Sequence, residues 1–301
     1  MKIAVVGAGA LGLTFAAALA PVHDVIVLAR RTEVVDALRR DGITVETDGR
    51  TSVVPVRATI VPDDLHHRDA WLVAVKAYAT RDALAPLAGA LPTNVLVASI
   101  QNGIDFAADA RATLGPAARL APGTTMQGAT LLGPTHVRAI GRGHTTFARV
   151  DPPGTSSDEL AAAFVAAGLR TEVVGDIDAH LWRKLLVNAV INPLGALSGR
   201  PNGTIADDDD VRALGHQLAD EAAAVAAREG YAITSPWTLV EDAARATAAN
   251  RNSMLQDLEA GRRTEVEAIS GAIVRRAAVH GIPVPLTQAM LRLVRARERA
   301  D

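Results

Sequence analysis

The first half of the chain alternates short β-branched runs with amphipathic helical stretches. The runs are KIAVV, DVIVL, WLVAV and VLVAS, which begin at Lys2, Asp24, Trp71 and Val95, and helical periodicity follows them at residues 10–20, 32–40, 78–90 and 104–114. Strands that alternate with helices in this way are typical of a parallel, doubly wound sheet with helices on both faces. The pattern therefore predicts an α/β domain of the Rossmann type.

Weaker strand patterns lie between and after these units. The segments ITVETDG and TSVVPVRA predict a hairpin or small strand excursion around Asp48 and Gly49. Residues 119–126, 136–140 and 145–150 also favour strands, separated by glycine and proline. We expect these later strands to extend the sheet.

From residue 179 onward the pattern changes to long helical periodicity with few strand-like runs. We therefore predict an N-terminal domain at residues 1–175 and an all-α domain at residues 176–301, with the boundary near Gly175 and Asp176. The run Asp207 to Asp210 is interpreted as a helix start, because carboxylates are stabilised at the positive end of the helix dipole. Adjacent carboxylates on a helix point in different directions, so no metal site is expected there.

Composition excludes several classes of function. Lys plus Arg total 31 against 33 for Asp plus Glu, and aromatic residues are few, whereas nucleic-acid binders usually show a basic excess or aromatic stacking platforms. The chain has no cysteine, which excludes disulfides and thiolate chemistry and fits a reducing compartment. No apolar stretch has the length of a membrane span. We expect a cytoplasmic protein that binds neither nucleic acid nor membrane.

A glycine-rich motif follows the first predicted strand and opens the first predicted helix. It is GxGxxG, formed by Gly7, Ala8, Gly9, Ala10, Leu11 and Gly12. In a dinucleotide fingerprint the first glycine permits the tight turn, the second lets the pyrophosphate approach the backbone, and the third allows close packing of helix on strand. The motif predicts that these six residues bind a dinucleotide at the helix N-terminus.

The residue that follows the second strand indicates which dinucleotide is bound. An enzyme that uses NAD usually places Asp or Glu there for the ribose hydroxyls, but this chain has Arg30. A guanidinium can bind a 2′-phosphate in bidentate fashion, which favours NADP (as NADPH) over NAD. The alternative is that Arg30 is an ordinary exposed residue at a helix start.

Three polar residues share one face of an otherwise apolar helical segment, HLWRKLLVNAVINPLGAL. They are Lys184, Asn188 and Asn192, spaced four residues apart. A lysine in such surroundings would be partly desolvated, which lowers its pKa and suits it to donate a proton near neutral pH. The alternative is a stripe that faces solvent, although this arginine-rich chain uses lysine at only three positions.

Two further candidates follow predicted parallel strands. Lys76 comes after WLVAV and Asn102 comes after VLVAS, so both lie at carboxyl ends of strands, where open α/β sheets bind ligands. Lys76 is suited to bind an anion, and the Asn102 amide is suited to hydrogen-bond a substrate or a nicotinamide.

Together, five segments resemble the ketopantoate reductase family of NADPH-dependent 2-dehydropantoate 2-reductases. They are GAGALG, VAVKAY around Lys76, IQNG around Asn102, WRKLLVNAVINPLGAL around Lys184, and NSMLQDLEAGRRTEVEAISG around Ser253 and Glu265. The resemblance spans almost the whole chain. It implies reduction of 2-dehydropantoate to pantoate on the way to pantothenate and coenzyme A.

The resemblance also implies roles for individual residues. Lys184 looks like the family's proton donor, while Asn188, Asn192 and Ser253 resemble its substrate-contacting residues. Arg30, Lys76, Asn102 and Glu265 look like cofactor or active-site residues. Without the resemblance, Glu265 would be explained as a surface glutamate beside Arg262 and Arg263, and no nucleophile motif surrounds Ser253.

These observations predict a reductase whose active site lies in the cleft between a Rossmann domain and a helical substrate domain. A 2-keto acid is the expected small-molecule partner, and no metal is expected. The candidate assembly is a homodimer. Two alternatives stay open: a related 2-keto acid or β-hydroxy acid dehydrogenase, and a dinucleotide-sensing protein that has lost turnover.

Overall fold

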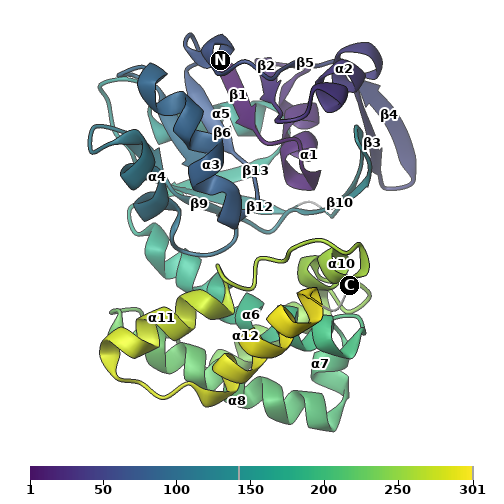
Figure 1. Cartoon of the computed structure of the whole chain (residues 1–301), viewed down its shortest axis with the longest axis vertical. Coiled ribbons are helices and arrows are strands. Elements are labelled where there is room, and N and C mark those ends of the chain that lie inside the picture. Colours follow the sequence, from purple (N-terminus) through teal and green to yellow (C-terminus); the bar gives the residue numbers. More distant parts are fainter. Residues whose placement is uncertain (142, 300–301) are drawn as a thin grey trace. The chain divides into compact units, whose positions relative to one another are not determined.

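The chain folds into two compact units in the computed structural model, which describes residues 1–141 and 143–299 (Figure 1). The first unit comprises Met1–Gln101 and Phe106–Ile177. The second comprises Asn102–Asp105 and Asp178–Asp301, the latter described as far as residue 299. The four residues Asn102–Asp105 thus belong to the second unit, although in sequence they lie between two stretches of the first.

Within the described residues, the strands of the first unit form three sheets, of which the largest has six strands in the order β5-β2-β1-β6-β7-β8. All neighbouring pairs in this sheet are parallel. Its strands are β1 (Lys2–Val6), β2 (Asp24–Leu28), β5 (Arg57–Thr59), β6 (Ala70–Val73), β7 (Leu96–Ser99) and β8 (Arg119–Ala121). The chain runs from β1 outward to β5 and then resumes with β6 on the other side of β1. This reversal beside β1 is the topological switch point of a Rossmann fold, which confirms the predicted fold class.

Helices cover both faces of this sheet. Alternate residues of a strand point to opposite faces, so Ile3 and Val5 pack in one apolar cluster while Ala4 and Val6 pack in another. The first cluster includes residues of α1 (Ala10–Leu19), α2 (Thr32–Asp41) and α5 (Ser157–Ala166), and the second includes residues of α3 (Thr80–Leu84) and α4 (Phe106–Leu114). Burial on both faces explains why Ile3 to Val6 are all apolar rather than alternating with polar residues.

The predicted hairpin is confirmed. Strands β3 (Ile43–Thr47) and β4 (Arg50–Val54) are antiparallel, and Asp48 and Gly49 between them have φ values of 49° and 74°. Positive φ at both central residues is typical of a two-residue hairpin loop with a type I′ turn. The hairpin joins β10 (Gly128–Gly133) and β11 (His136–Ile140) in a four-stranded sheet.

The expectation that the later strands extend the main sheet is wrong for all but β8. The predicted strand at residues 119–126 is two strands: β8 in the main sheet, and β9 (Gly123–Thr125) in a separate sheet with β12 (His144–Ala148) and β13 (Arg170–Val174). The break falls at Pro122, which has no N–H to continue a ladder.

Proline also divides the helix predicted at residues 78–90. That stretch contains a short turn η2 (Ala77–Ala79), then α3, then a second 3₁₀ segment η3 (Ala85–Ala90) that includes Pro86; another, η1 (Pro62–Leu65), precedes β6. Pro86 has no backbone N–H to donate to the carbonyl four residues earlier, so the α-helical hydrogen-bond ladder of α3 stops at Leu84. The helix predicted from residue 104 begins at Phe106.

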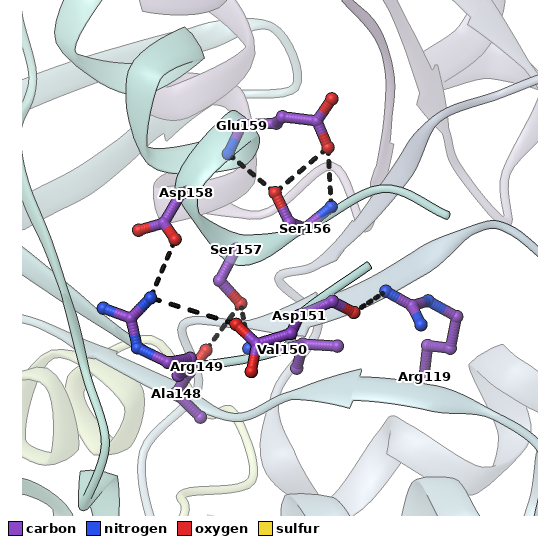
Figure 2. Close-up of polar contacts among 9 residues, drawn as sticks. All are labelled: Arg119, Ala148, Arg149, Val150, Asp151, Ser156, Ser157, Asp158 and Glu159. Atoms are coloured by element: carbon purple, nitrogen blue, oxygen red, sulfur yellow. Dashed lines mark hydrogen bonds and ion pairs between the residues drawn. The ribbon is translucent and has the colours of Figure 1, made fainter. Parts of the chain in front are cut away.

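The sequence analysis did not predict α5, although its start carries a local signal. Ser156 Oγ accepts from the Glu159 backbone N–H, and the Glu159 carboxylate accepts from the Ser156 backbone N–H (Figure 2). This reciprocal pair is a capping box, readable from the S-x-x-E spacing. In the same view Arg149 pairs with Asp158, and Arg119 donates to the Asp151 carbonyl.

The second unit is helical, as predicted. Its helices are α6 (Ile177–Ser198), α7 (Thr204–Asp207), α8 (Asp209–Arg228), α9 (Pro236–Ala246), α10 (Ser253–Glu259), α11 (Ser270–His280) and α12 (Pro285–Glu298). The aspartate run starts a helix, because Asp208 caps α8 by accepting from the Val211 N–H. Leu186 and Val190 of α6 pack in one core with Leu218 and Val225 of α8.

In the part of the chain that the structure describes, none of the helices is both long enough and apolar enough to span a membrane.

Candidate active site

The glycine loop leaves no room for side chains at two of its positions. Gly7 has φ +116°, and a Cβ there would lie 2.7 Å from Val75 Cγ1, while a Cβ at Gly12 would lie 2.0 Å from the Gly7 carbonyl oxygen. At Gly9, by contrast, the nearest atom to a Cβ is 3.9 Å away. The first and third glycines therefore pack the loop tightly, and the second leaves its backbone open to a ligand.

The loop presents backbone donors at the switch point of the sheet. It connects β1 to α1, beside β6, and the helix begins after Gly9 with no side chain capping its first N–H groups. Uncapped N–H groups and the positive end of a helix dipole attract a phosphate. The geometry of these residues fits the pyrophosphate of a dinucleotide.

Arg30 stands two residues beyond β2 as an exposed side chain. Within residues 1–141 and 143–299 its guanidinium has no hydrogen-bond or ion-pair partner, whereas the adjacent Arg31 lies 3.7 Å from Glu33. No carboxylate follows β2 at the position where a ribose would be bound. An unpaired guanidinium at this position fits a 2′-phosphate.

Lys76 is half-buried in the loop after β6, and a residue that the sequence analysis missed holds this loop. Gln101, 7% exposed, donates from Nε2 to the Val75 carbonyl at 2.7 Å and to Thr80 Oγ1 at 2.9 Å. Its Oε1 accepts from Ser99 Oγ at 3.0 Å. Gln101 thus ties the end of β7 to the Lys76 loop. One amide in a loop gives no sequence signal for such a role.

The polar face of α6 points into the protein. Lys184 and Asn188 are half-buried and Asn192 is 4% exposed, so the solvent-facing stripe considered from the sequence is wrong. Burial lowers the pKa of Lys184 from 10.5 to about 8, and the negative charge of Glu265 acts in the opposite direction by raising it. The lysine therefore titrates close to physiological pH.

Glu265 and Asn102 complete what we call the lysine cluster: Lys184, Asn188, Asn102 and Glu265. Asn102 Nδ2 donates to Glu265 Oε2 at 2.9 Å, and Asn188 Nδ2 donates to Asn102 Oδ1 at 3.4 Å. Glu265 is 6% exposed and lies in a turn before α11, which excludes the surface-helix explanation. Asn102 was expected at the sheet edge, yet its contacts are with the helical unit.

The N-terminus of α10 docks on α6 beside Asn192. Asn252 caps α10, and its Nδ2 donates to the Ile191 carbonyl at 3.1 Å. A Cβ at Gly195 would lie 2.2 Å from that Nδ2, so this approach needs glycine. The contact brings Ser253, the exposed first residue of α10, to the part of α6 that carries Asn192. The sequence analysis missed Asn252 and Gly195, for which only the N-cap preference of asparagine gave a signal.

The side chain of Asn192 makes no hydrogen bond to any other residue that the structure describes. Some unpaired polar side-chain atoms of the described residues are completely shielded from solvent, but those of Asn192 are not among them. The Asn192 amide therefore keeps some contact with solvent. A buried amide normally has a partner. The Asn192 amide is thus available for a further hydrogen bond.

The candidate residues therefore divide between the two units. The lysine cluster, Asn192 and Ser253 belong to the helical unit, whereas the glycine loop, Arg30 and Lys76 belong to the Rossmann unit.

Comparison with known proteins identifies the family. The model for "Ketopantoate reductase PanE/ApbA" matches residues 3–152, and that for its C-terminal part matches residues 176–298. A 2-dehydropantoate 2-reductase of Archaeoglobus fulgidus is 36% identical over 99% of this chain and 98% of the relative. A PanE/ApbA family ketopantoate reductase from Ralstonia eutropha JMP134 superposes with a TM-score of 0.91 at 33% identity, covering 100% of this chain and 99% of that one.

A second solved structure is similar in fold alone. D-mandelate dehydrogenase with NADH and anilino(oxo)acetate has a TM-score of 0.92 but 23% identity, over 100% of this chain and 99% of that one. The two family models and the full-length match to a 2-dehydropantoate 2-reductase show that this chain belongs to the ketopantoate reductase family.

Proposed function

We propose that this protein reduces the ketone of 2-dehydropantoate to the alcohol of pantoate, with NADPH as the hydride donor. The observation that carries the proposal is the half-buried Lys184, whose pKa of about 8 is set by burial and by Glu265. Membership of the ketopantoate reductase family supports this choice of reaction over that of the fold neighbour D-mandelate dehydrogenase.

The Rossmann unit contains groups suited to bind the dinucleotide. The uncapped N–H groups at the start of α1 would hold the pyrophosphate, and Arg30 would hold the 2′-phosphate. We assign Lys76 to the anionic groups of cofactor or substrate. Bound NADPH would supply a hydride to the carbonyl carbon of the keto acid.

Lys184 would donate the proton that the reduction requires. Negative charge develops on the carbonyl oxygen as the carbon is reduced, and an ammonium within hydrogen-bond reach stabilises and then protonates it. With a pKa of about 8, about nine-tenths of Lys184 is protonated at pH 7. The amine left after donation would be reprotonated from solvent.

The amide and hydroxyl groups of the helical unit would orient the keto acid. We assign Asn188, Asn192 and Ser253 to its carboxylate and distal hydroxyl, and Asn102 with Glu265 to the support of Lys184. Holding a small substrate in a reactive orientation contributes much of the rate enhancement in such a reaction.

The proposal is tested by Lys184→Ala in a steady-state assay of NADPH oxidation with 2-dehydropantoate. We expect turnover to fall by about 10²–10⁴-fold because a general acid is lost, with little change in the dissociation constant of NADPH. The matched control is Lys2→Ala, an exposed lysine at the start of β1. A Lys184→Ala variant with turnover near wild type would exclude Lys184 as the proton donor.

The substrate is tested with the deoxy analogue 3,3-dimethyl-2-oxobutanoate. A site that pairs the distal hydroxyl leaves its own polar groups unsatisfied when that hydroxyl is missing, and discrimination can then reach about 10⁴-fold. Equal catalytic efficiency for the two acids would point to a general 2-keto acid reductase. The absence of turnover with every keto acid would point to a dinucleotide sensor.

We extend the proposal to a cytoplasmic homodimer. The lack of cysteine is typical of proteins in a reducing compartment, and two-fold dimers are the commonest soluble oligomers. Light scattering after size-exclusion chromatography measures the assembly directly.

A further inference from the structure

Asp105 ends the short segment Asn102–Asp105, which belongs to the helical unit although the chain on both sides of it belongs to the Rossmann unit. Its carboxylate is held by two arginines of α11. Arg275 Nη2 donates to Asp105 Oδ2 at 2.9 Å, and Arg276 Nη2 donates to Oδ1 at 2.9 Å. Both carboxylate oxygens are therefore occupied by charge-assisted bonds, which are the stronger kind.

The two arginines are themselves held in place. Arg275 Nη1 donates to the Glu267 carbonyl at 3.3 Å, in the turn that carries Glu265. Arg276 lies 3.8 Å from the Glu229 carboxylate, and its guanidinium stands 6.0 Å from the centre of the Trp182 ring. The donors that hold Asp105 are thus fixed to α8, to α6 and to the turn before α11.

The other end of the segment lies against that same turn. Asn102 donates a hydrogen bond to Glu265. Gly103 has a φ of +91°, and a Cβ on it would lie 2.8 Å from the Ala268 carbonyl oxygen. The segment is therefore attached at Asn102 and at Asp105, with a close backbone contact between them. Detaching one end would leave Asn102 free to move away from Glu265.

We propose that Asp105 is a positioning residue of this reductase. Its hydrogen bonds with Arg275 and Arg276 hold the segment in place, and the segment in turn keeps the Asn102 amide hydrogen-bonded to the Glu265 carboxylate of the lysine cluster. The inference rests on the proposed function, in which the lysine cluster protonates the substrate. Ion pairs between partly exposed side chains generally add little to the free energy of unfolding. We therefore assign the Asp105 ion pairs to holding the conformation of the segment rather than to stabilising the fold.

A double-mutant cycle of Asp105→Asn and Asn102→Ala tests the inference. If Asp105 acts through Asn102, Asp105→Asn lowers kcat about tenfold in the wild-type background and less than about twofold in the Asn102→Ala background. The KM for NADPH should not change in either background. Losses that add, or no loss in the wild-type background, would overturn the proposal.

Asp109→Asn is the matched control. Asp109 is four residues further along the chain and accepts from Arg81 Nε at 2.7 Å, and its side chain is 26% exposed against 30% for Asp105. It lies on α4 in the Rossmann unit, so kcat should stay at the wild-type value. An equal loss in Asp109→Asn would show a general effect of breaking an ion pair. Arg275→Gln removes one of the two donors and should give a smaller loss than Asp105→Asn.

A second readout does not depend on turnover. The chain has three lysines, so Cε-labelled lysine gives few ¹³C signals, and that of Lys184 is identified by its loss in Lys184→Met. Asp105→Asn should lower the pKa of Lys184 by more in the wild-type background than in the Asn102→Ala background. Equal shifts in the two backgrounds would overturn the proposal. The charge of Asp105 itself would act in both backgrounds and cancels in the comparison. If wild type does not reduce 2-dehydropantoate, the proposed function is wrong, and this cycle still supports or overturns the role of Asp105.

Discussion

The negative charge of Glu265 should set the pH at which this reductase loses activity. Burial lowers the pKa of Lys184 to about 8, and that value already includes the opposing effect of Glu265. The substitution Glu265→Gln keeps the size of the side chain and removes its charge. The pKa of Lys184 should then fall below about 8, because the ammonium form loses its stabilising partner.

The expected pH dependence follows from the protonated fraction of Lys184. A proton donor is active below its pKa, so kcat for reduction should fall as pH rises through about 8. Between pH 7 and pH 9 the ammonium fraction drops about tenfold, whereas a lysine with the ordinary value of 10.5 would lose only a few per cent. In Glu265→Gln the fall should begin at lower pH, and each further tenfold loss at pH 9 corresponds to about 1.4 kcal/mol of lost attraction.

The assay is kcat for NADPH oxidation from about pH 6 to 10 at saturating 2-dehydropantoate. Glu267→Gln is the matched control, since Glu267 is two residues away and pairs with Arg295. Its profile should coincide with that of wild type. The reasoning is refuted if the wild-type fall lies near 10.5, or if Glu265→Gln leaves the fall unmoved or shifts it to higher pH.

Three further predictions concern the cofactor, the docking of α10 and stability. Arg30→Ala should weaken NADPH binding by about ten- to hundredfold with little effect on NADH, because one charge-assisted contact is worth roughly 1.5–3 kcal/mol; Arg31→Ala is the control, and equal losses for both cofactors in titrations would exclude Arg30 as the phosphate ligand. Gly195→Ala should raise the KM for the keto acid, because its Cβ would lie 2.2 Å from Asn252 Nδ2 and displace the start of α10. The control is Gly89→Ala, whose Cβ would meet nothing within 4 Å, and equal KM values for the two variants in steady-state kinetics would contradict the prediction. The free energy of unfolding of wild type relative to Lys184→Met should rise by up to about 3 kcal/mol between pH 8 and 10.5, because there the unfolded chain binds the proton that the folded protein does not; denaturant titrations with a constant difference would refute it.

Local features of the sequence were sufficient to predict the Rossmann unit and one face of the site. Gly12 is required by the Gly7 carbonyl within the loop, and Gly7 by its own φ of +116°, so their spacing is informative without the rest of the fold. The polar face of α6 follows from helical periodicity, which depends only on neighbours along the chain. Proline positions could also have located the breaks at Pro122 and Pro86, and the S-x-x-E spacing could have located α5.

Only the tertiary structure decided which of these groups lie together. Asn102 follows a strand of the Rossmann unit, yet its amide bonds Glu265, 163 residues further along the chain. The pKa of Lys184 likewise depends on how deeply α6 is buried and on a carboxylate from a distant turn. Periodicity and motifs report interactions between residues that are close in sequence, whereas desolvation and charge act through space. For that reason the sequence determined which residues are candidates for the site, and packing determined which of them share a cluster.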